Sequence, residues 1–116
     1  MNLVPNAANA IVDVRKLTGY LLDPTHPRGA SKAELFARFG FVASNWQDLR
    51  DALLDHVTLH SVTSSEPTPF GFSYEVEGSL VAPDGPTTHV LVVWFIRSDE
   101  AEPRLVTVVP SREKQR

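Results

Sequence analysis

Apolar residues recur at helical spacing in the first part of the chain. The positions are Val14, Leu17, Leu21 and Leu22. They form one face of a helix predicted over residues 14–22. Asp13 is suited to cap this helix, because its carboxylate can accept hydrogen bonds from the free N–H groups of the first turn. Pro24 ends the helix, since the residue before a proline is disfavoured in the helical region.

Two further helices are predicted next. Ser31 and Glu34 form an S-x-x-E capping box, in which each side chain satisfies a backbone donor of the first turn. Gly40 is the residue type expected just after the last turn of that helix. Ser44 and Gln47 form a second capping box. The apolar positions that follow the two boxes are Leu35, Phe36 and Phe39, then Trp46, Leu49, Leu53 and Val57.

From residue 70 onward the apolar pattern changes to a period of two. The alternating apolar positions are Phe70, Phe72, Tyr74, Val76 and Leu80. This alternation predicts a strand with one solvated face. Residues 90–96 are continuously apolar, which predicts a central strand covered on both faces. Residues 105–109 predict a last strand, whereas residues 58–69 are rich in Ser, Thr and Pro and are interpreted as a loop with a short strand near 59–62.

The order of these elements predicts an α+β fold, in which N-terminal helices pack on a C-terminal three- to four-stranded antiparallel β-sheet. The strands are antiparallel because their connections are short. A chain of 116 residues has the usual length of one domain. We therefore expect a single domain over residues 1–110 and a charged C-terminal tail over residues 111–116.

The net charge of −3 conceals an uneven distribution. Residues 1–50 contain six basic and four acidic side chains, whereas residues 51–102 contain one basic and nine acidic ones. A weakly acidic protein is not a general nucleic-acid binder, since such binding needs a positive surface. The helical half and the tail can still form a local positive patch, and the alternative is ordinary solvated surface.

Composition and motifs exclude several classes of function. The chain has no cysteine, so it forms neither disulfides nor thiolate metal sites. No apolar run approaches the ~20 residues of a membrane span, and the N-terminus lacks the order of a signal peptide, so we expect a cytoplasmic protein away from membranes. Phosphate-loop, dinucleotide-binding, zinc-protease and serine-hydrolase motifs do not occur. We expect no cofactor.

The strongest local group of chemically active residues is His26-Pro27-Arg28-Gly29-x-x-Lys32. It places a histidine and an arginine on a stiff loop, and a lysine on the first turn of the next helix. Cations beside a helix N-terminus are suited to holding a phosphate, and a histidine can exchange protons there. In the alternative interpretation, His26 caps the end of the first helix, while Arg28 and Lys32 are solvated.

Other polar residues give weaker signals. His56 and His60 have i, i+4 spacing, but no third ligand follows at a known spacing, so we expect no metal site. His89 is interpreted as a strand-end surface residue, and the alternative is that it belongs to a site on the sheet. The last two strands carry Arg97, Arg104 and Thr107, of which Thr107 shares a face with apolar neighbours and is alternatively a buried hydroxyl.

Several stretches together resemble a family of small, uncharacterised bacterial and phage-associated domains. The stretches are Pro5-Asn6-Ala7, Ile11-Val12-Asp13-x-x-Lys16-Leu17, Tyr20-Leu21-Leu22-Asp23-Pro24-x-His26-Pro27-x-Gly29-x-x-Lys32-Ala33-x-x-Phe36, Phe39-Gly40-Phe41, Trp94-x-Ile96-Arg97 and Pro103-Arg104-Leu105-x-Thr107. Such domains are similar to the barnase/EndoU/RelE-like superfamily, which consists mostly of metal-independent ribonucleases, many of them toxins. The resemblance implies N-terminal helices before a four-stranded antiparallel sheet, the order already predicted from the residue pattern.

The resemblance also implies a role for each candidate residue. The chain is then a ribonuclease toxin of a toxin–antitoxin or polymorphic toxin system, with RNA as substrate and an antitoxin or immunity protein as partner. His26 is the acid or base, Lys32 holds the phosphate together with Arg28, Arg97 or Arg104, and Thr107 donates a hydrogen bond. The alternative is a non-catalytic module, such as an antitoxin, an immunity protein or a phage accessory protein, whose acidic residues 51–102 bind a basic partner.

Overall fold

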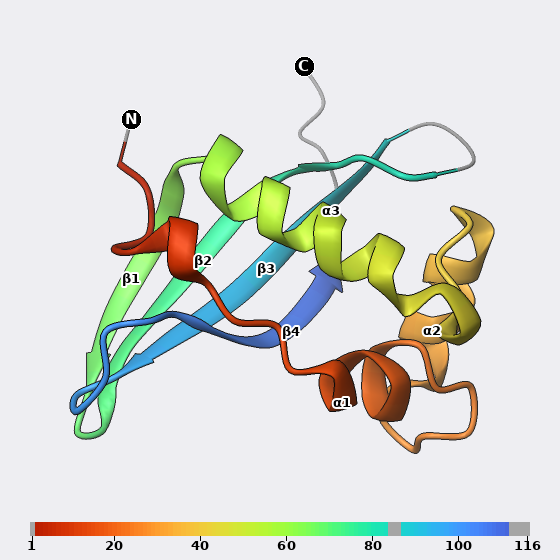
Figure 1. Cartoon of the computed structure of the whole chain (residues 1–116), viewed down its shortest axis with the longest axis horizontal. Helices are drawn as coiled ribbons and strands as arrows, with labels where there is room; N and C mark the ends of the chain where they lie inside the picture. Colours follow the sequence, from red (N-terminus) through yellow and green to blue (C-terminus); the bar gives the residue numbers. More distant parts are fainter. Residues whose placement is uncertain (1, 84–86, 112–116) are drawn as a thin grey trace.

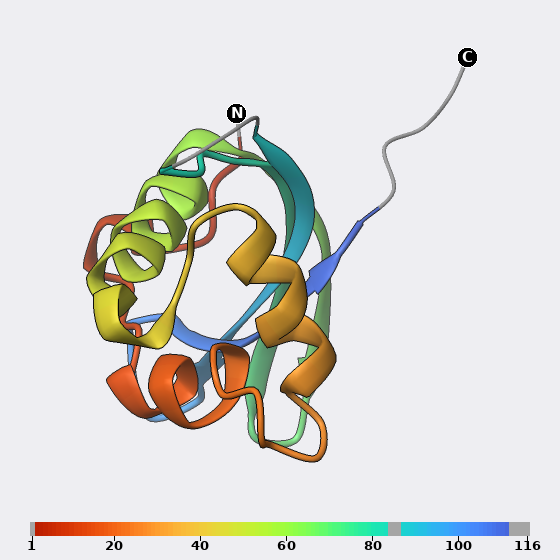
Figure 2. The ribbon, with the colours of Figure 1, turned by 90° about the vertical axis from the view of Figure 1, so that its right-hand side faces the viewer.

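The chain folds into helices on one side of a four-stranded antiparallel sheet, which confirms the predicted α+β fold. The computed structural model describes residues 2–83 and 87–111. Its elements are η1 (Ala7–Asn9), α1 (Val14–Lys16), η2 (Leu17–Leu21), α2 (Ala30–Arg38), η3 (Ala43–Asn45), α3 (Trp46–Leu59), β1 (Val62–Thr68), β2 (Gly71–Leu80), β3 (Thr88–Arg97) and β4 (Arg104–Pro110). Figure 1 shows α3 lying across the sheet, and Figure 2 shows that the sheet curves around it. Of the predicted charged tail, only Ser111 lies within the described residues.

The sheet has the order β1-β2-β3-β4, so neighbours in sequence are neighbours in space. The ladder between β3 and β4 shifts register between Val93 and Trp94. The segment before the helices also reaches β4. Ile11 N–H donates to the carbonyl of Pro103, and Leu105 N–H donates to the carbonyl of Ile11, at 2.8 and 3.0 Å. The N-terminal segment is thereby tied to β4, an edge strand.

The first helix begins as predicted. The Asp13 carboxylate accepts a hydrogen bond from the backbone N–H of Arg15 at 2.9 Å. The α-helical turn of α1 then widens into the π-helical turn η2, which ends at Leu21. Leu17 and Leu21 are fully buried, as their spacing predicted. Gly40 has a positive φ of 90° after α2, which is the conformation that favours glycine at a helix end.

Neither predicted capping box forms. Helix α2 begins at Ala30, so Ser31 lies inside its first turn, and no side chain caps it. Its early N–H groups bond instead to the preceding loop, where Ala30 donates to the carbonyl of His26 and Ala33 to that of Gly29. Ser44 lies within the 3-10 turn η3, which leads directly into α3. At α2, backbone carbonyls thus accept hydrogen bonds from the early N–H groups, where a side-chain cap was expected.

The interpretation of residues 58–69 as mainly loop was wrong. Helix α3 continues to Leu59, and residues 62–68 form the edge strand β1. Both faces of β1 are largely exposed. An edge strand at the end of a sheet needs no apolar alternation, and it tolerates a proline such as Pro67. This is why the polar sequence gave no strand signal.

The apolar core lies between the helices and one face of the sheet. Its fully buried members include Leu17, Leu21, Leu49, Leu53, Val57, Val76, Leu80, Val90, Val92, Trp94 and Val108. Residues 90–96 lie in a central strand, as predicted, but the prediction that both faces of this strand are covered was wrong. Val90, Val92 and Trp94 are buried, whereas Leu91 and Val93 are only partly so. Because helix α3 covers one face only, the second face of β3 belongs to what we call the open face of the sheet.

Replacement of Gly71 with alanine should destabilise the fold. Gly71 has a φ of +152°, and a Cβ at this position would lie 2.0 Å from the carbonyl oxygen of Ile96. The strands would have to separate, so we expect the free energy of unfolding to fall by about 2–3 kcal/mol. Chemical denaturation measures this loss. Gly19→Ala is the matched control, because no atom lies within 4 Å of a Cβ there, and equal stability of the two variants would contradict the prediction.

Candidate functional site

A hollow of about 390 Å³ lies between the first helical segment and β4. We call it the His26 hollow. It is lined by Lys16, Tyr20, His26, Arg28, Val106 and Thr107. The hydroxyl groups of Tyr20 and Thr107 form a hydrogen bond of 3.1 Å across 87 residues of sequence. This bond holds the η2 turn against β4 and so closes one side of the hollow.

The His26 ring is held by its own loop. Its Nδ1 accepts hydrogen bonds from the backbone N–H groups of Arg28, at 2.9 Å, and Gly29, at 3.0 Å. The proton of the neutral ring is therefore on Nε2, the nitrogen left free for the hollow. The Tyr20 ring packs edge-on against the His26 ring, with 5.1 Å between centroids. The alternative in which His26 caps the end of the first helix was wrong, because its ring bonds lie at the start of α2.

Gly29 allows this arrangement. A Cβ on Gly29 would lie 2.1 Å from the carbonyl oxygen of Tyr20. Only glycine lets the loop pass so close to the η2 turn. The close approach brings the backbone N–H of Gly29 to the His26 ring and places the ring beside Tyr20. The sequence L-D-P-x-H-P-x-G thus forms a compact turn that holds the His26 imidazole in position.

Two cations belong to the His26 hollow. The Lys16 ammonium lies 5.9 Å from the centre of the Tyr20 ring, and Arg28 is exposed at the rim. Within residues 2–83 and 87–111, neither side chain forms an ion pair. In the part of the chain that the structure describes, no carboxylate lines the hollow. The site therefore offers positive charge, N–H and O–H donors, which together suit an anion such as a phosphate.

The structure brings some of the predicted residues together and separates others. His26, Arg28 and Thr107 line the same hollow. Lys32 lines a different one, with Arg38 and Pro110. Arg97 and Arg104 line a third and contact carboxylates, those of Asp99 at 3.6 Å and Glu100 at 3.0 Å. Three of the predicted residues are thus gathered at the site, and their roles stay predictions.

Sequence reasoning missed Lys16 and Tyr20. Their i, i+4 spacing places them on one side of the first helical segment, next to the apolar face that was identified. Tyr20 was counted with the family motif and not as a functional group. Its partner Thr107 lies 87 residues away, and no local pattern predicts such a pairing. The i, i+4 pair of a lysine and a tyrosine was the one signal available.

Comparisons with known proteins place this geometry in context. A family model described as a domain of unknown function, DUF6883, matches residues 3–112. The chain belongs to the DUF6883 family. Its fold is similar to that of one chain in a contact-dependent growth inhibition toxin–immunity protein complex from Klebsiella pneumoniae 342. The TM-score is 0.70 at 16% identity, and the match covers 88% of this chain and 100% of that one.

The structural match supports the fold of the DUF6883 domain and does not by itself assign an activity. No curated protein sequence matches the chain. The solved complex contains both a toxin and an immunity protein, so similarity to it associates this fold with such systems. The predicted ribonuclease superfamily is compatible with this association but is not demonstrated by it. Among the helices of the described residues, none has the length and apolar character needed to cross a membrane.

The pair His56 and His60 of the DUF6883 domain ties α3 to β2. Their Nε2 atoms bond to the carbonyl oxygens of Gly78, at 3.2 Å, and Ser79, at 3.0 Å. Burial lowers the pKa of His56 to about 4, against the raising effect of its bond to Gly78. Within the described part of the chain, no three His, Asp or Glu residues are grouped to hold a metal ion. The two rings therefore have a structural explanation.

A second polar cluster lies on the open face of the sheet. His89 Nε2 is 3.9 Å from a carboxylate oxygen of Glu77, and the Ser111 hydroxyl donates to the same carboxylate. Both His89 ring nitrogens are buried and lack a hydrogen-bond partner among the described residues. His89 is thus less exposed than a strand-end surface histidine was expected to be. None of these three residues lines the His26 hollow.

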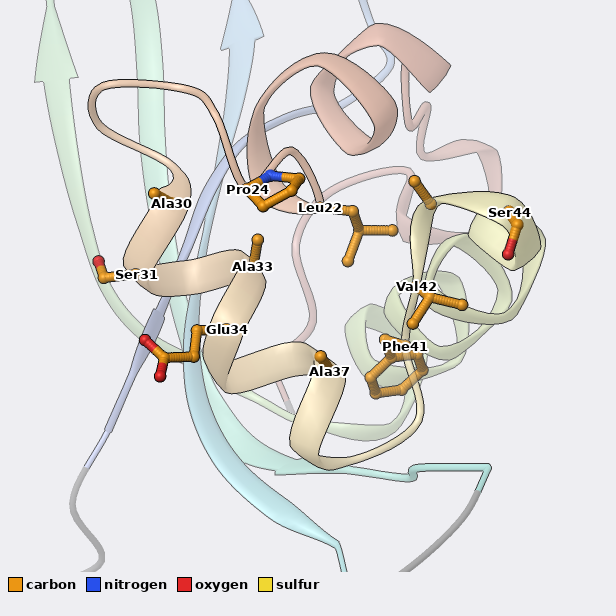
Figure 3. A pocket seen from close by; sticks show the side chains of 11 residues that line it. Leu22, Pro24, Ala30, Ser31, Ala33, Glu34, Ala37, Phe41, Val42 and Ser44 are labelled. Atoms are coloured by element: carbon orange, nitrogen blue, oxygen red, sulfur yellow. The ribbon is translucent and has the colours of Figure 1, made fainter.

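A larger hollow of about 730 Å³ lies between α2 and the segment that joins it to α3 (Figure 3). Small and apolar side chains dominate its walls, among them Leu22, Ala33, Ala37, Phe41 and Val42. Glu34 is its one titratable side chain, and that carboxylate lies 3.8 Å from Arg38. Among the described residues, these walls carry one carboxylate and no histidine, lysine or arginine, so they do not suit a phosphate, and size alone does not make this hollow the functional site.

Proposed function

We propose that this DUF6883 chain is a toxin-type domain that cleaves RNA. The observation that carries the proposal is the His26 hollow, where a histidine, two cations and a pair of bonded hydroxyls line one small cavity. The fold similarity to a chain of a toxin–immunity complex supports it. Because the lining lacks carboxylates and supplies its own positive charge, we propose that cleavage needs no metal ion.

The substrate is held by its phosphate. Lys16 and Arg28 neutralise the negative charge, which increases at the phosphate oxygens as the transition state forms. His26 Nε2–H donates a hydrogen bond to the same group. The two backbone N–H groups at Nδ1 offset negative charge on the ring and so strengthen the opposite N–H as a donor. In this proposal His26 is a positioned donor, which is a narrower role than acid or base.

The cleavage step conserves every atom of the RNA. The 2′-oxygen forms a bond to phosphorus, the bond from phosphorus to the 5′-oxygen breaks, and one proton moves from the 2′-hydroxyl to the 5′-oxygen. The products are a 2′,3′-cyclic phosphate and a 5′-hydroxyl end. The Tyr20–Thr107 pair provides a path for this proton, because each hydroxyl can accept one proton while it passes on its own.

Incubation of purified chain with total RNA and a metal chelator tests this proposal. We expect fragments with 5′-hydroxyl ends, which accept a labelled phosphate from polynucleotide kinase without prior dephosphorylation. Fragments with 5′-phosphate ends would contradict the proposed step, because they form when water attacks phosphorus and the bond to the 3′-oxygen breaks. Complete loss of cleavage on chelation would contradict the metal-independent chemistry.

A second candidate function is a non-catalytic module that binds a basic partner protein. The observation that favours it is a row of exposed carboxylates on α3, formed by Asp48, Asp51 and Asp55. These residues border a shallow hollow with Val81 and Ala82. Affinity purification with the tagged chain decides between the two. One stoichiometric basic partner, together with intact RNA at high protein concentration, would favour the binding module.

A further inference from the structure

A third hollow, of about 570 Å³, combines aromatic rings with guanidinium groups. It is lined by Phe70, Phe95, Arg97, Ser98, Asp99, Arg104 and Val106. Phe70 is 74% exposed, which is unusual for a phenylalanine. An exposed aromatic ring beside arginines is the combination that holds unpaired bases in single-stranded nucleic acids. We call this cavity the Phe70 hollow.

The Phe70 ring stands on a rigid turn. The backbone N–H of Phe70 donates to the Thr68 hydroxyl at 3.1 Å. Its carbonyl accepts a hydrogen bond of 2.9 Å from the backbone N–H of Ser98. Gly71 follows in close contact with β3, where a Cβ would meet the Ile96 carbonyl. The turn thus holds the backbone of Phe70 in place, while 74% of the residue stays exposed.

The guanidinium groups of the Phe70 hollow are oriented by neighbouring carboxylates. Arg104 Nε donates to Glu100 at 3.0 Å, and Arg97 Nε lies 3.6 Å from Asp99. Each contact uses Nε and leaves the terminal nitrogens of the guanidinium for another acceptor. Such a group can lie flat against a base or meet a phosphate. A purely apolar partner would leave these donors without an acceptor, so the lining favours a nucleotide over an apolar protein surface.

The Phe70 hollow adjoins the His26 hollow. Val106 lines both, with Arg104 on one side of it and Thr107 on the other. Three residues of strand span roughly 10 Å. A short stretch of extended single strand therefore reaches from one hollow to the other along β4. Strand β4 thus connects a cavity suited to a phosphate with one suited to a base.

We propose that the Phe70 hollow binds an unpaired nucleobase of single-stranded RNA next to the cleaved phosphate. The inference rests on the proposed function, since it assigns the substrate class of the same site. The base stacks on the rings of Phe70 and Phe95, and Arg104 faces its backbone. Double-stranded RNA is excluded, because its bases are already stacked on one another and cannot enter the hollow.

The test uses short, fluorescein-labelled oligonucleotides with 2′-O-methyl groups, which cannot be cleaved by attack of the 2′-oxygen. Fluorescence anisotropy measures their binding to the full chain, as a single strand and as a duplex. We expect the single strand to bind more tightly, and Phe70→Ala to weaken it by about fivefold to a hundredfold. Phe72→Ala is the matched control, because Phe72 is 50% exposed and lies outside the Phe70 hollow.

Equal binding of single strand and duplex would overturn the inference, as would equal affinities of Phe70→Ala and Phe72→Ala. It would also be overturned if Phe70→Ala abolished capture of a protein partner while oligonucleotide binding stayed normal. The outcome is separable from the proposed function. A chain that binds single strands through Phe70 but never cleaves RNA keeps the base subsite and loses the ribonuclease. If the chain cleaves RNA and Phe70→Ala leaves oligonucleotide binding unchanged, the ribonuclease proposal stands and the base subsite is refuted.

Discussion

Replacement of His26 with alanine should reduce RNA cleavage by about a hundredfold to a thousandfold. Removal of one positioned donor from a site that stabilises developing charge typically has an effect of this size. The fold should be preserved, because the hydrogen bonds of the ring to described residues stay within its own loop, at the N–H groups of Arg28 and Gly29. Single-turnover cleavage of a labelled RNA measures the loss, and thermal denaturation verifies that the variant is folded.

Replacement of His26 with glutamine separates the proposed donor from a proton carrier. A glutamine amide can donate a hydrogen bond from a position similar to that of Nε2, but it does not titrate. If His26 acts as a donor, His26→Gln should retain clearly more cleavage than His26→Ala. Equal loss in both variants would show that the ring must carry the proton itself. Unchanged cleavage by His26→Ala would show that His26 takes no part in cleavage.

Acidification from pH 6.5 to 4 should lower the free energy of unfolding by about 3 kcal/mol through His56 alone. Burial holds the pKa of His56 at about 4 in the fold, against an ordinary value of 6.5, and a difference of this size is worth about 3 kcal/mol. Within this window the unfolded chain binds a proton that the folded chain does not, so stability falls as pH falls. The contribution is fully present above pH 6.5.

Denaturant unfolding at a series of pH values measures this dependence. We expect the wild type to lose stability between pH 6.5 and 4. His56→Gln should start lower and show a much smaller loss. A flat profile of the wild type in this window would contradict the buried neutral state of His56.

Much of the fold was predictable from residue periodicity, and the predictions that were wrong have physical explanations. Helical spacing placed Leu17, Leu21, Leu49 and Leu53 in the core, and all four are fully buried. Periodicity was wrong for Val14, Phe70 and Phe72, which it placed on apolar faces and which are exposed. Strand β1 was missed because it is an edge strand with one neighbour and its polar side chains are exposed to solvent. Such a strand needs no apolar alternation. The capping box at Ser31 did not form, because backbone carbonyls of the preceding loop accept hydrogen bonds at the start of α2. Local signals thus predicted the core better than the element ends.

The candidate site was only partly predictable. The motif around His26 and Arg28 indicated an anion site at the start of a helix, and the structure gives both residues one hollow with Thr107. Lys32 lies in α2 and lines a different hollow, together with Arg38 and Pro110. Tyr20 became visible only when the fold brought it to Thr107. Contacts between distant segments depend on packing, which no local pattern of residues encodes.

Induced expression of the unmodified chain in a bacterium that lacks its partner tests the central claim most directly. The proposal predicts growth arrest with accumulation of RNA fragments that end in 5′-hydroxyl groups. His26→Ala, expressed to the same level, should permit growth. Normal growth and intact RNA with the unmodified, soluble chain would contradict the assignment of this DUF6883 domain as an RNA-cleaving toxin.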